Sequence, residues 1–480
     1  MVKDLLAVVP LLFLVVWACF LLLMDFAIPA KRKGVGALLA AVGLVIALGL
    51  TLGLPNPDKV AFSGMLVVDG FARFLNGLFI FSGLAGVALA YDYLKRMGLE
   101  RGEYYALLLF SISGMMLMAM AADLIVVFLA LELLSIPLYI LAGFARPQPE
   151  SEEAALKYFL LGAFAAGFVV YGVALVFGAT GTTSLEGVVA AISAETTNLT
   201  LLVAGAGLIL VGLGFKVAAV PFHMWTPDVY QGAPSAVTGF MAVGAKAGGF
   251  AALLRVFVVA FPAQANELTP VLWGVAALSM VVGNIIAIAQ QNIKRMLAYS
   301  SIAHAGYILM AFVPFGIQEV TASSVAAGLF YLLAFAVTSF GAWAVVIALE
   351  RKGNLGLSLD DYAGLGRSHP SLAAAMAVFM LSFTGVPPTL GFVGKFYLFR
   401  IVIDGGFVYL ALVGVLTSLI SAYYYLRVVV IMYMREGEPE VRSEAWLKLT
   451  TVAAAVGTVV LSLVSAPLFG WAADAVLRLF

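Results

Sequence analysis

Fourteen apolar runs dominate this sequence, and each is long enough to cross a lipid bilayer as a helix. About 20 apolar residues span the bilayer's hydrocarbon core, which is about 30 Å thick. The runs cover residues 5–28, 34–54, 70–92, 103–122, 124–145, 155–178, 199–229, 233–260, 269–290, 296–315, 322–350, 371–402, 405–434 and 446–470. Lipid offers the backbone no hydrogen-bond partners, so we expect an all-α integral membrane protein with about 14 transmembrane helices.

The composition agrees with a lipid environment and excludes several kinds of function. Apolar residues make up 63% of the chain and charged residues only 11%, against about 25% charged in an ordinary soluble domain. The 26 basic residues balance the 26 acidic ones, which argues against a nucleic-acid partner. One cysteine, Cys19, and three histidines are too few for an iron–sulfur cluster, a structural zinc site or a haem. We therefore expect no cofactor in this chain.

Basic residues are unevenly distributed between alternate loops, and this predicts the orientation. Sixteen lie in one set of loops, Lys31, Lys294 and Arg295 among them. Only six, including Arg255 and Arg478, lie in the other set and at the two termini. The positive-inside rule places the sixteen-residue side in the cytoplasm. Because the number of helices is even, both termini are then expected on the outer side.

Two of the longest runs contain prolines that should break their helices. Pro221 lies in "GFKVAAVPFHMW", and Pro387 and Pro388 lie in "FTGVPPTLGFVGKF". Proline removes a backbone donor, which a membrane helix tolerates only where protein or water satisfies the freed groups. Interrupted helices at corresponding positions of two halves indicate a transport site.

The spacing of short matches predicts an internal repeat. The two Val-Pro pairs are 166 residues apart, as are two Ser-Ile pairs that begin at Ser135 and Ser301. Each unit then holds five helices, and an odd number inverts the second copy in the membrane. The predicted divisions are a three-helix N-terminal segment, a first five-helix repeat, a second, inverted repeat, and a C-terminal loop with helix 14, at residues 1–102, 103–268, 269–434 and 435–480.

Four charged residues lie well inside apolar runs: Glu132, Lys216, Lys246 and Lys395. A charge at the bilayer centre costs about 2.5–3.5 kcal/mol even on the lenient scale. One reading is structural ion pairing, but one carboxylate cannot pair with three lysines. The other is a chain of protonatable groups. Burial favours neutral lysine and a nearby carboxylate favours charged lysine, so a change in the distance to Glu132 would switch a lysine between holding and releasing a proton.

His304 is a neutral polar residue inside another apolar run, "IKRMLAYSSIAHAGYILM". Ser300, Ser301 and Tyr307 are within one helical turn of it, which predicts a polar stripe on one face of the helix. The histidine is therefore either a relay residue or a satisfied core residue.

Other polar residues admit simpler readings. His223 follows Pro221 and serves either a cytoplasmic inlet or the capping of freed carbonyls. Tyr423, Tyr424 and Tyr425 are expected to be packing and interface residues. Lys157, near a cytoplasmic helix start, can reach the surface with its long stem.

A resemblance to a known family extends from about residue 60 to residue 435. It is carried by "ESEEAALKYFLLGAFAAGFVVYGVAL", "FKVAAVPFHMWTPDVYQGAPSAVTGFMAVGAKAGGFA", "NIKRMLAYSSIAHAGYILM" and "GLGRSHPSLAAAMAVFMLSFTGVPPTLGFVGKFYLF". These segments resemble subunit N of bacterial NADH:quinone oxidoreductase, respiratory complex I. The resemblance implies fourteen helices, two inverted five-helix units, and breaks in helices seven and twelve.

The resemblance also implies roles for the buried charges. Glu132 on helix five would pair with Lys216 on broken helix seven, Lys246 on helix eight would be the central relay, and Lys395 on broken helix twelve the exit-side residue. A lysine at 395 speaks against the sister subunit M. The lack of an amphipathic arm after residue 470 speaks against the sister subunit L.

By this resemblance, the chain moves protons from the cytoplasm outward across the bacterial inner membrane, driven by quinone reduction elsewhere in the complex. NADH, FMN, iron–sulfur clusters and quinone are expected in partner subunits, with subunit M and small membrane subunits as neighbours. Three alternatives stay open. They are an Mrp-type cation/proton antiporter subunit, a membrane subunit of a related hydrogenase or ferredoxin-dependent complex, and a structural scaffold with vestigial charges.

Overall fold

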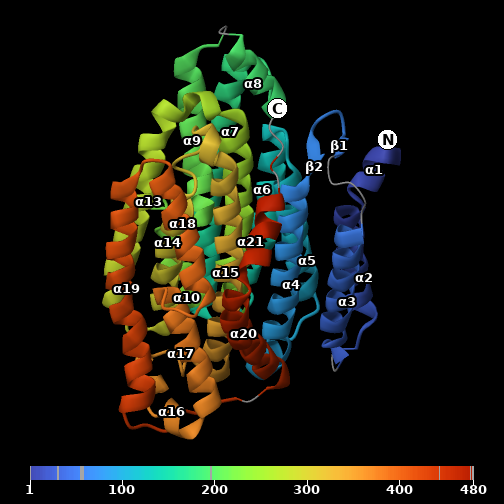
Figure 1. Ribbon diagram of the computed structural model, residues 1–480. Helices are drawn as coiled ribbons and strands as arrows, with labels where there is room; N and C mark the ends of the chain where they lie inside the picture. Colours follow the sequence, from blue (N-terminus) through green and yellow to red (C-terminus); the bar gives the residue numbers. More distant parts are fainter. Residues whose placement is uncertain are drawn as a thin grey trace.

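A computed structural model describes residues 2–29, 32–53, 59–194, 197–442, 444–475 and 477. Its helices form one elongated bundle (Figure 1). Only one short antiparallel hairpin, β1 (Lys59–Ala61) with β2 (Leu66–Val68), lies within the described ranges. The α-helices are α1 (Val2–Ala7), α2 (Val9–Ala27), α3 (Val35–Gly53), α4 (Gly70–Met97), α5 (Glu103–Met120), α6 (Leu124–Ala142), α7 (Pro149–Thr180), α8 (Leu185–Ser193), α9 (Leu199–Val217), α10 (Trp225–Gly232), α11 (Ser235–Phe240), α12 (Lys246–Leu253), α13 (Ala265–Ile288), α14 (Ile293–Met310), α15 (Gln318–Leu349), α16 (Leu365–Ser368), α17 (Pro370–Thr384), α18 (Leu390–Asp404), α19 (Val408–Met434), α20 (Ala445–Leu463) and α21 (Ser465–Asp474).

The predicted all-α membrane architecture is confirmed. Twelve spans in the described part of the chain are long and apolar enough to cross a membrane. The helix α14 and the pair α17–α18 occupy the two remaining predicted runs. Short helical turns complete the list: the π-helical η2 (Met241–Ala245) and η3 (Leu254–Val258), and the 3-10 turns η4 (Pro262–Gln264) and η5 (Leu359–Tyr362).

The two ends of the bundle differ in what they carry. The lower end in Figure 1 carries α16 and the segment between α19 and α20, and we call it the basic end because Arg351, Arg367, Arg435 and Arg442 lie there. The upper end carries α1 and α8, and α21 continues α20 towards it. Both chain ends are therefore directed to the same side, as an even number of crossings requires. Lys31 and Arg478, used in the charge count, lie outside the described residues.

Both predicted helix breaks are present. Helix α9 ends at Val217, and Ala218 takes a left-handed conformation with φ of 61°, an uncommon one for a residue with a side chain. The chain becomes helical again at Trp225, beyond Pro221. The second break is similar. Helix α17 ends before Gly385, whose φ is 90°, and α18 starts beyond the two prolines.

The bundle has a buried axis and a lipid-facing periphery. Helix α15 is 94% buried over its most apolar window and packs on α17, α18 and α20, whereas α20 is only 22% buried. The α7 and α9 backbones touch, because a side-chain carbon at Gly172 would lie 2.7 Å from the Gly205 carbonyl oxygen. Only glycine permits this approach, and it fixes α9, which carries Lys216, against α7.

Arg255 differs from the loop residues with which the charge count groups it. It is fully buried in η3 and paired with Asp69, the residue that caps the start of α4. Its Nη1 donates to Asp69 Oδ2 at 2.5 Å and its Nη2 to Asp69 Oδ1 at 2.9 Å, while its Nε donates to the Ala119 carbonyl at 3.2 Å. Asp69 also caps α4 by accepting from the Ala72 backbone N–H. Because Asp69 forms a bidentate ion pair with Arg255 and neutralises its charge, the guanidinium can stay buried away from water.

Candidate functional site

Lys216 lies in the last turn of α9, directly before the first break, and only 2% of it is exposed. Its ammonium donates to Ser135 Oγ of α6 at 2.8 Å and to the Tyr158 hydroxyl of α7 at 3.0 Å. It also lies 5.2 Å from the centre of the Tyr158 ring. Side-chain hydroxyls from two neighbouring helices, and no backbone groups among the described contacts, therefore hold this charge.

Glu132 shares a small cavity with Lys216, which Ser135 and Tyr139 also line. The carboxylate is only half-buried, and the Lys216 ammonium is hydrogen-bonded to hydroxyls instead of to it. The two charges interact across the cavity. Direct pairing of Glu132 with Lys216, implied by the family resemblance, therefore stays a prediction for a different arrangement of this cavity.

Lys246 begins α12, immediately after the π-helical turn η2. It is buried, and its ammonium donates to the Ser301 carbonyl at 2.6 Å and to Ser301 Oγ at 2.8 Å. Gly249, one turn further on, faces Lys216, since a side-chain carbon there would lie 3.3 Å from the Lys216 Cγ. The first helical turn of α12 thus lies between the two lysines. Single π-turns occur often at functional sites.

The polar stripe predicted around His304 is confirmed. On α14, Ser301 accepts from Lys246, and His304 lies one turn further along. His304 Nδ1 is 2.8 Å from the Tyr331 hydroxyl, and its Nε2 is 3.0 Å from the Tyr425 hydroxyl. Both ring nitrogens are therefore in hydrogen bonds that reach other helices, α15 and α19.

Lys395 lies beyond the second break, in the second turn of α18, and is buried. Its ammonium donates to the carbonyls of Phe383 and Thr384, both at 2.9 Å, and to Ser418 Oγ at 2.6 Å. It also lies 4.6 Å from the centre of the Tyr307 ring, which completes the stripe on α14. These carbonyls are at the end of α17, where no further helical turn uses them.

The tyrosine triplet was only partly anticipated. Tyr423 is 61% exposed, in line with an interface residue, but the other two are buried and hydrogen-bonded. Tyr424 donates to Asn284 Oδ1 at 2.8 Å, and Tyr425 is 2.5 Å from Ser300 Oγ as well as bonded to His304. Tyr425 therefore extends the polar stripe. His223, in contrast, lies half-buried at the break, and its Nδ1 has no hydrogen-bond partner among the described residues.

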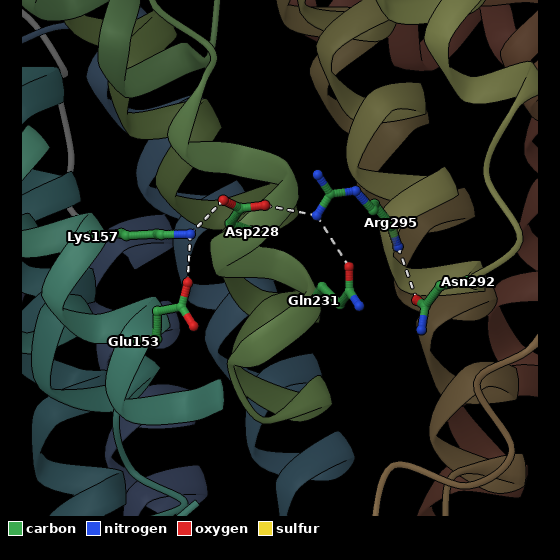
Figure 2. A network of polar contacts seen from close by, with 6 residues as sticks. All are labelled: Glu153, Lys157, Asp228, Gln231, Asn292 and Arg295. Carbon is green, nitrogen blue, oxygen red and sulfur yellow. Dashed lines mark hydrogen bonds and ion pairs between the residues drawn. The ribbon is translucent and has the colours of Figure 1, made fainter. Parts of the chain in front are cut away.

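A second polar cluster lies where α7, α10 and α14 meet. Figure 2 shows Asp228 of α10 between Lys157 of α7 and Arg295 of α14. Both ion pairs are 2.7 Å long, and Lys157 also pairs with Glu153 at 2.6 Å. These side chains, with others, line an open cavity of about 210 Å³. Trp225, on the same short helix as Asp228, stacks on the Tyr158 ring with centroids 4.5 Å apart.

Besides Asp69, Asp123 and Arg255, two charged residues near the basic end are buried although no sequence pattern selects them. Glu350 ends α15 and Lys294 lies in the first turn of α14, and each is only 2% exposed. Both positions are at helix ends, where charges usually reach the surface. The one available signal was their place at the edges of apolar runs. In the described part of the chain, no group of three His, Cys, Asp or Glu residues comes together to hold a metal.

Comparisons with known proteins agree on one family. A protein-family profile described as NADH:quinone oxidoreductase/Mrp antiporter, TM, matches residues 121–421. NADH-quinone oxidoreductase subunit N of Chloroflexus aggregans is 50% identical over 473 residues, covering 97% of this chain and 96% of that protein. The chain belongs to the NADH-quinone oxidoreductase subunit N family. The subunit N of Trichlorobacter lovleyi is 45% identical, covering 98% of this chain and 96% of that protein.

Solved structures share the fold of this chain. A chain of respiratory complex I from Thermus thermophilus, solved with bound Aureothin, matches with a TM-score of 0.82 and 38% identity, covering 97% of this chain and 99% of that chain. A chain of the Mrp complex from Dietzia sp. has a TM-score of 0.84 but only 22% identity, with 98% and 97% covered, so it shows the fold alone. The protein is thus an antiporter-like, proton-translocating membrane subunit of complex I, a proton-pumping translocase, and works with other subunits.

Proposed function

We propose that Glu132, Lys216, Lys246, His304 and Lys395 form the proton relay of this subunit. The observation that carries the proposal is the polar face of α14. Ser301 on that face holds Lys246, Tyr307 faces Lys395, and His304 lies between them. One helix thus supplies hydrogen-bonding groups over the whole distance between the central lysine and the exit-side lysine.

The surroundings of the three lysines suit proton carriers. Each ammonium donates to neutral hydroxyls or carbonyls, in the hydrogen bonds that the structure describes. Loss of a proton from Lys246 or Lys395 leaves no hydrogen-bonded carboxylate behind among the described residues. Placing a charge near the bilayer centre costs about 2.5–3.5 kcal/mol, and no ion pair offsets this cost for these lysines in the described contacts. A function in proton transfer explains why they are there.

The proposed direction runs from the basic end to the opposite end. The positive-inside rule assigns the basic end to the cytoplasm and both termini to the outer side of the bacterial inner membrane. Protons would pass from Lys216, adjusted by Glu132, to Lys246, then along His304 to Lys395 and out. The two units, residues 103–268 and 269–434, would be inverted copies.

The energy is proposed to come from quinone reduction elsewhere in the complex. NADH, FMN, iron–sulfur clusters and quinone would bind partner subunits, and subunit M with small membrane subunits would be the neighbours. Because this subunit would hold no redox centre, it can couple to quinone reduction only through a conformational or electrostatic change that reaches it from the partner subunits. That change would alter the cavity that Glu132 and Lys216 share.

The test replaces the central lysine in the assembled complex. Lys246→Ala should lower both quinone reduction and proton translocation in vesicles by about tenfold or more, since general acid–base groups contribute about 10²–10⁴-fold. The control is Lys448→Ala, which removes an exposed lysine from α20. Normal pumping by Lys246→Ala would overturn the relay. Sodium-driven proton exchange without NADH or quinone would support the Mrp-type alternative instead.

A further inference from the structure

Glu350 and Lys294 are buried charges that the relay does not use. They lie near the basic end, on the neighbouring helices α15 and α14, and both reach the junction of α10 and α11, Glu350 through Tyr93. Burying an ionised group costs several kcal/mol unless other groups compensate for the lost water. A buried acid and a buried base in a proton-translocating subunit therefore require a specific explanation.

The contacts of Glu350 come from several helices. Tyr93 of α4 donates its hydroxyl to Glu350 Oε1 at 3.3 Å and accepts from the Ser235 backbone N–H of α11 at 3.1 Å. Lys294 donates to the Ala233 carbonyl at 2.7 Å, at the junction of α10 and α11. The other carboxylate oxygen, Oε2, has no hydrogen-bond partner within the described ranges.

Buried hydroxyl groups follow the same junction towards Lys246. Ser235 Oγ and the Tyr230 hydroxyl are both buried and have no hydrogen-bond partner among the residues described. Tyr230 lies beside Ser301, whose Oγ and carbonyl hold the Lys246 ammonium. A hydroxyl both donates and accepts, and it rotates to do so, which is what transfer of a proton along hydrogen bonds requires.

We propose that Glu350, with Lys294 beside it, is a proton-uptake site that supplies Lys246 through Tyr93, Ser235, Tyr230 and Ser301. The carboxylate takes a proton from water at the basic end. Rotation of the unpaired Ser235 and Tyr230 hydroxyls would link the Tyr93 hydroxyl to Ser301, and neutral Lys246 then becomes an ammonium. Glu350 then returns to the carboxylate form, which the positive charge of Lys294 stabilises. The inference rests on the proposed function, because Lys246 must carry the proton onward.

A surface cavity lined by Asn292, Arg295 and Leu357 lies beside the start of α14, the helix that carries Lys294. Arg295 points into that cavity, while the preceding residue, Lys294, points into the interior. Adjacent residues in the first turn of α14 therefore face the polar surface and the buried interior. Besides Tyr93 and Lys294, the titratable group facing Glu350 among the described residues is Tyr362 of η5.

The test measures coupled proton uptake by the whole complex in vesicles over a range of pH. Glu350→Gln keeps the shape of the side chain but cannot release and rebind a proton. Uptake must then rely on free protons and other routes, so the deficit relative to wild type should grow as pH rises. We expect a loss of about twofold or less at pH 6 and about tenfold or more at pH 8.

The matched control is Glu444→Gln. Glu444 is a largely buried carboxylate at the same end of the bundle, paired with Arg96 at 2.7 Å and without a contact to Glu350 in the described structure. Its pH profile should run parallel to that of wild type. Tyr93→Phe keeps the carboxylate and removes one hydroxyl, so it should show the same pH-dependent loss at about two- to threefold.

Two outcomes would overturn the uptake site. One is a Glu350→Gln profile identical to wild type, and the other is a deficit that is the same at every pH, which a structural role predicts. If Glu350→Gln does not assemble, Tyr93→Phe alone must show the rising deficit. Lys246→Ala separates the two proposals. If it stops pumping while Glu350→Gln behaves as wild type, only the uptake site is wrong, whereas normal pumping by Lys246→Ala removes the relay itself.

Discussion

The two helix breaks hold their lysines in different ways. Lys216 lies before its break, and its partners are two side-chain hydroxyls, with Glu132 across a small cavity. Lys395 lies after its break, and two of its three partners are backbone carbonyls at the end of α17. The carbonyl end of a helix carries partial negative charge, so the ammonium of Lys395 is stabilised by groups that cannot rotate away.

The difference indicates a division of labour along the proposed relay. Rotation of Ser135 or Tyr158, or movement of Glu132, changes the surroundings of Lys216 without disturbing any helix. The two carbonyl contacts of Lys395 change only if α17 and α18 separate. We therefore expect the first break to be the adjustable one, and substitutions around it to have the larger effects.

The largest expected effect comes from Lys216 itself. Lys216→Ala removes the protonatable group at the adjustable break, so quinone reduction and proton translocation should fall together by about tenfold or more. Both rates should be measured in the same vesicles. Slow pumping with normal quinone reduction would show that the two processes are not tightly coupled, and unchanged pumping would exclude Lys216 from the relay.

Glu132 should come second. Glu132→Gln leaves the Lys216 ammonium without a neighbouring negative charge in a buried site, which destabilises the charged form and should stall turnover by about five- to tenfold. Glu132→Asp keeps the charge with a shorter reach and should be milder. The measurement is a pH profile of coupled activity for both variants and wild type, with assembly checked on native gels. Wild-type behaviour of Glu132→Gln across the whole range would make the carboxylate structural.

The third prediction compares equivalent hydroxyls at the two breaks. Tyr158→Phe removes one of two hydroxyl partners of Lys216, whereas Ser418→Ala removes one of three partners of Lys395 and leaves both carbonyls. We expect a loss of coupled activity of about three- to fivefold for the first and less than about twofold for the second, given about 0.5–1.5 kcal/mol for a hydrogen bond. Equal losses would contradict the division between the breaks.

The smallest effect is expected at the ion pairs of Figure 2. Asp228→Asn removes the carboxylate that joins α10, the second half of the first break, to α7 and α14. The pairs are partly exposed, so each contributes only about 0.2–1 kcal/mol. The matched control is Asp360→Asn, which breaks an exposed pair with Arg435. Thermal unfolding in detergent should show a slightly larger decrease for Asp228→Asn, and the reverse order would show that α10 needs no such anchor.

Features that depend on one stretch of sequence were predictable. Prolines in apolar runs gave the breaks, isolated charges gave the lysines, and helical spacing gave the stripe on α14. The residue-by-residue relay and the inverted repeat stay predictions, because no contact in one arrangement of the protein tests them.

Features that depend on packing between distant segments were not predictable. Glu350 is buried because α4, α11 and α14 pack over the end of α15. The residues next to Glu350 in the sequence give no sign of this packing. Three consecutive tyrosines likewise have no period that would select Tyr425 as the one facing His304. The hydroxyl partners of the lysines come from other helices, so only the fold identifies them.

The fully buried pair of Asp69 and Arg255 has a consequence for biogenesis. The two residues are 186 positions apart in the chain, so the start of α4 is synthesised long before the guanidinium that neutralises it. A charge left alone in lipid is costly, by up to about 2.5–3.5 kcal/mol at the centre of a span. We therefore expect Asp69, at the N-cap of α4, to stay near water until η3 has been made, when more than half of the chain has left the ribosome.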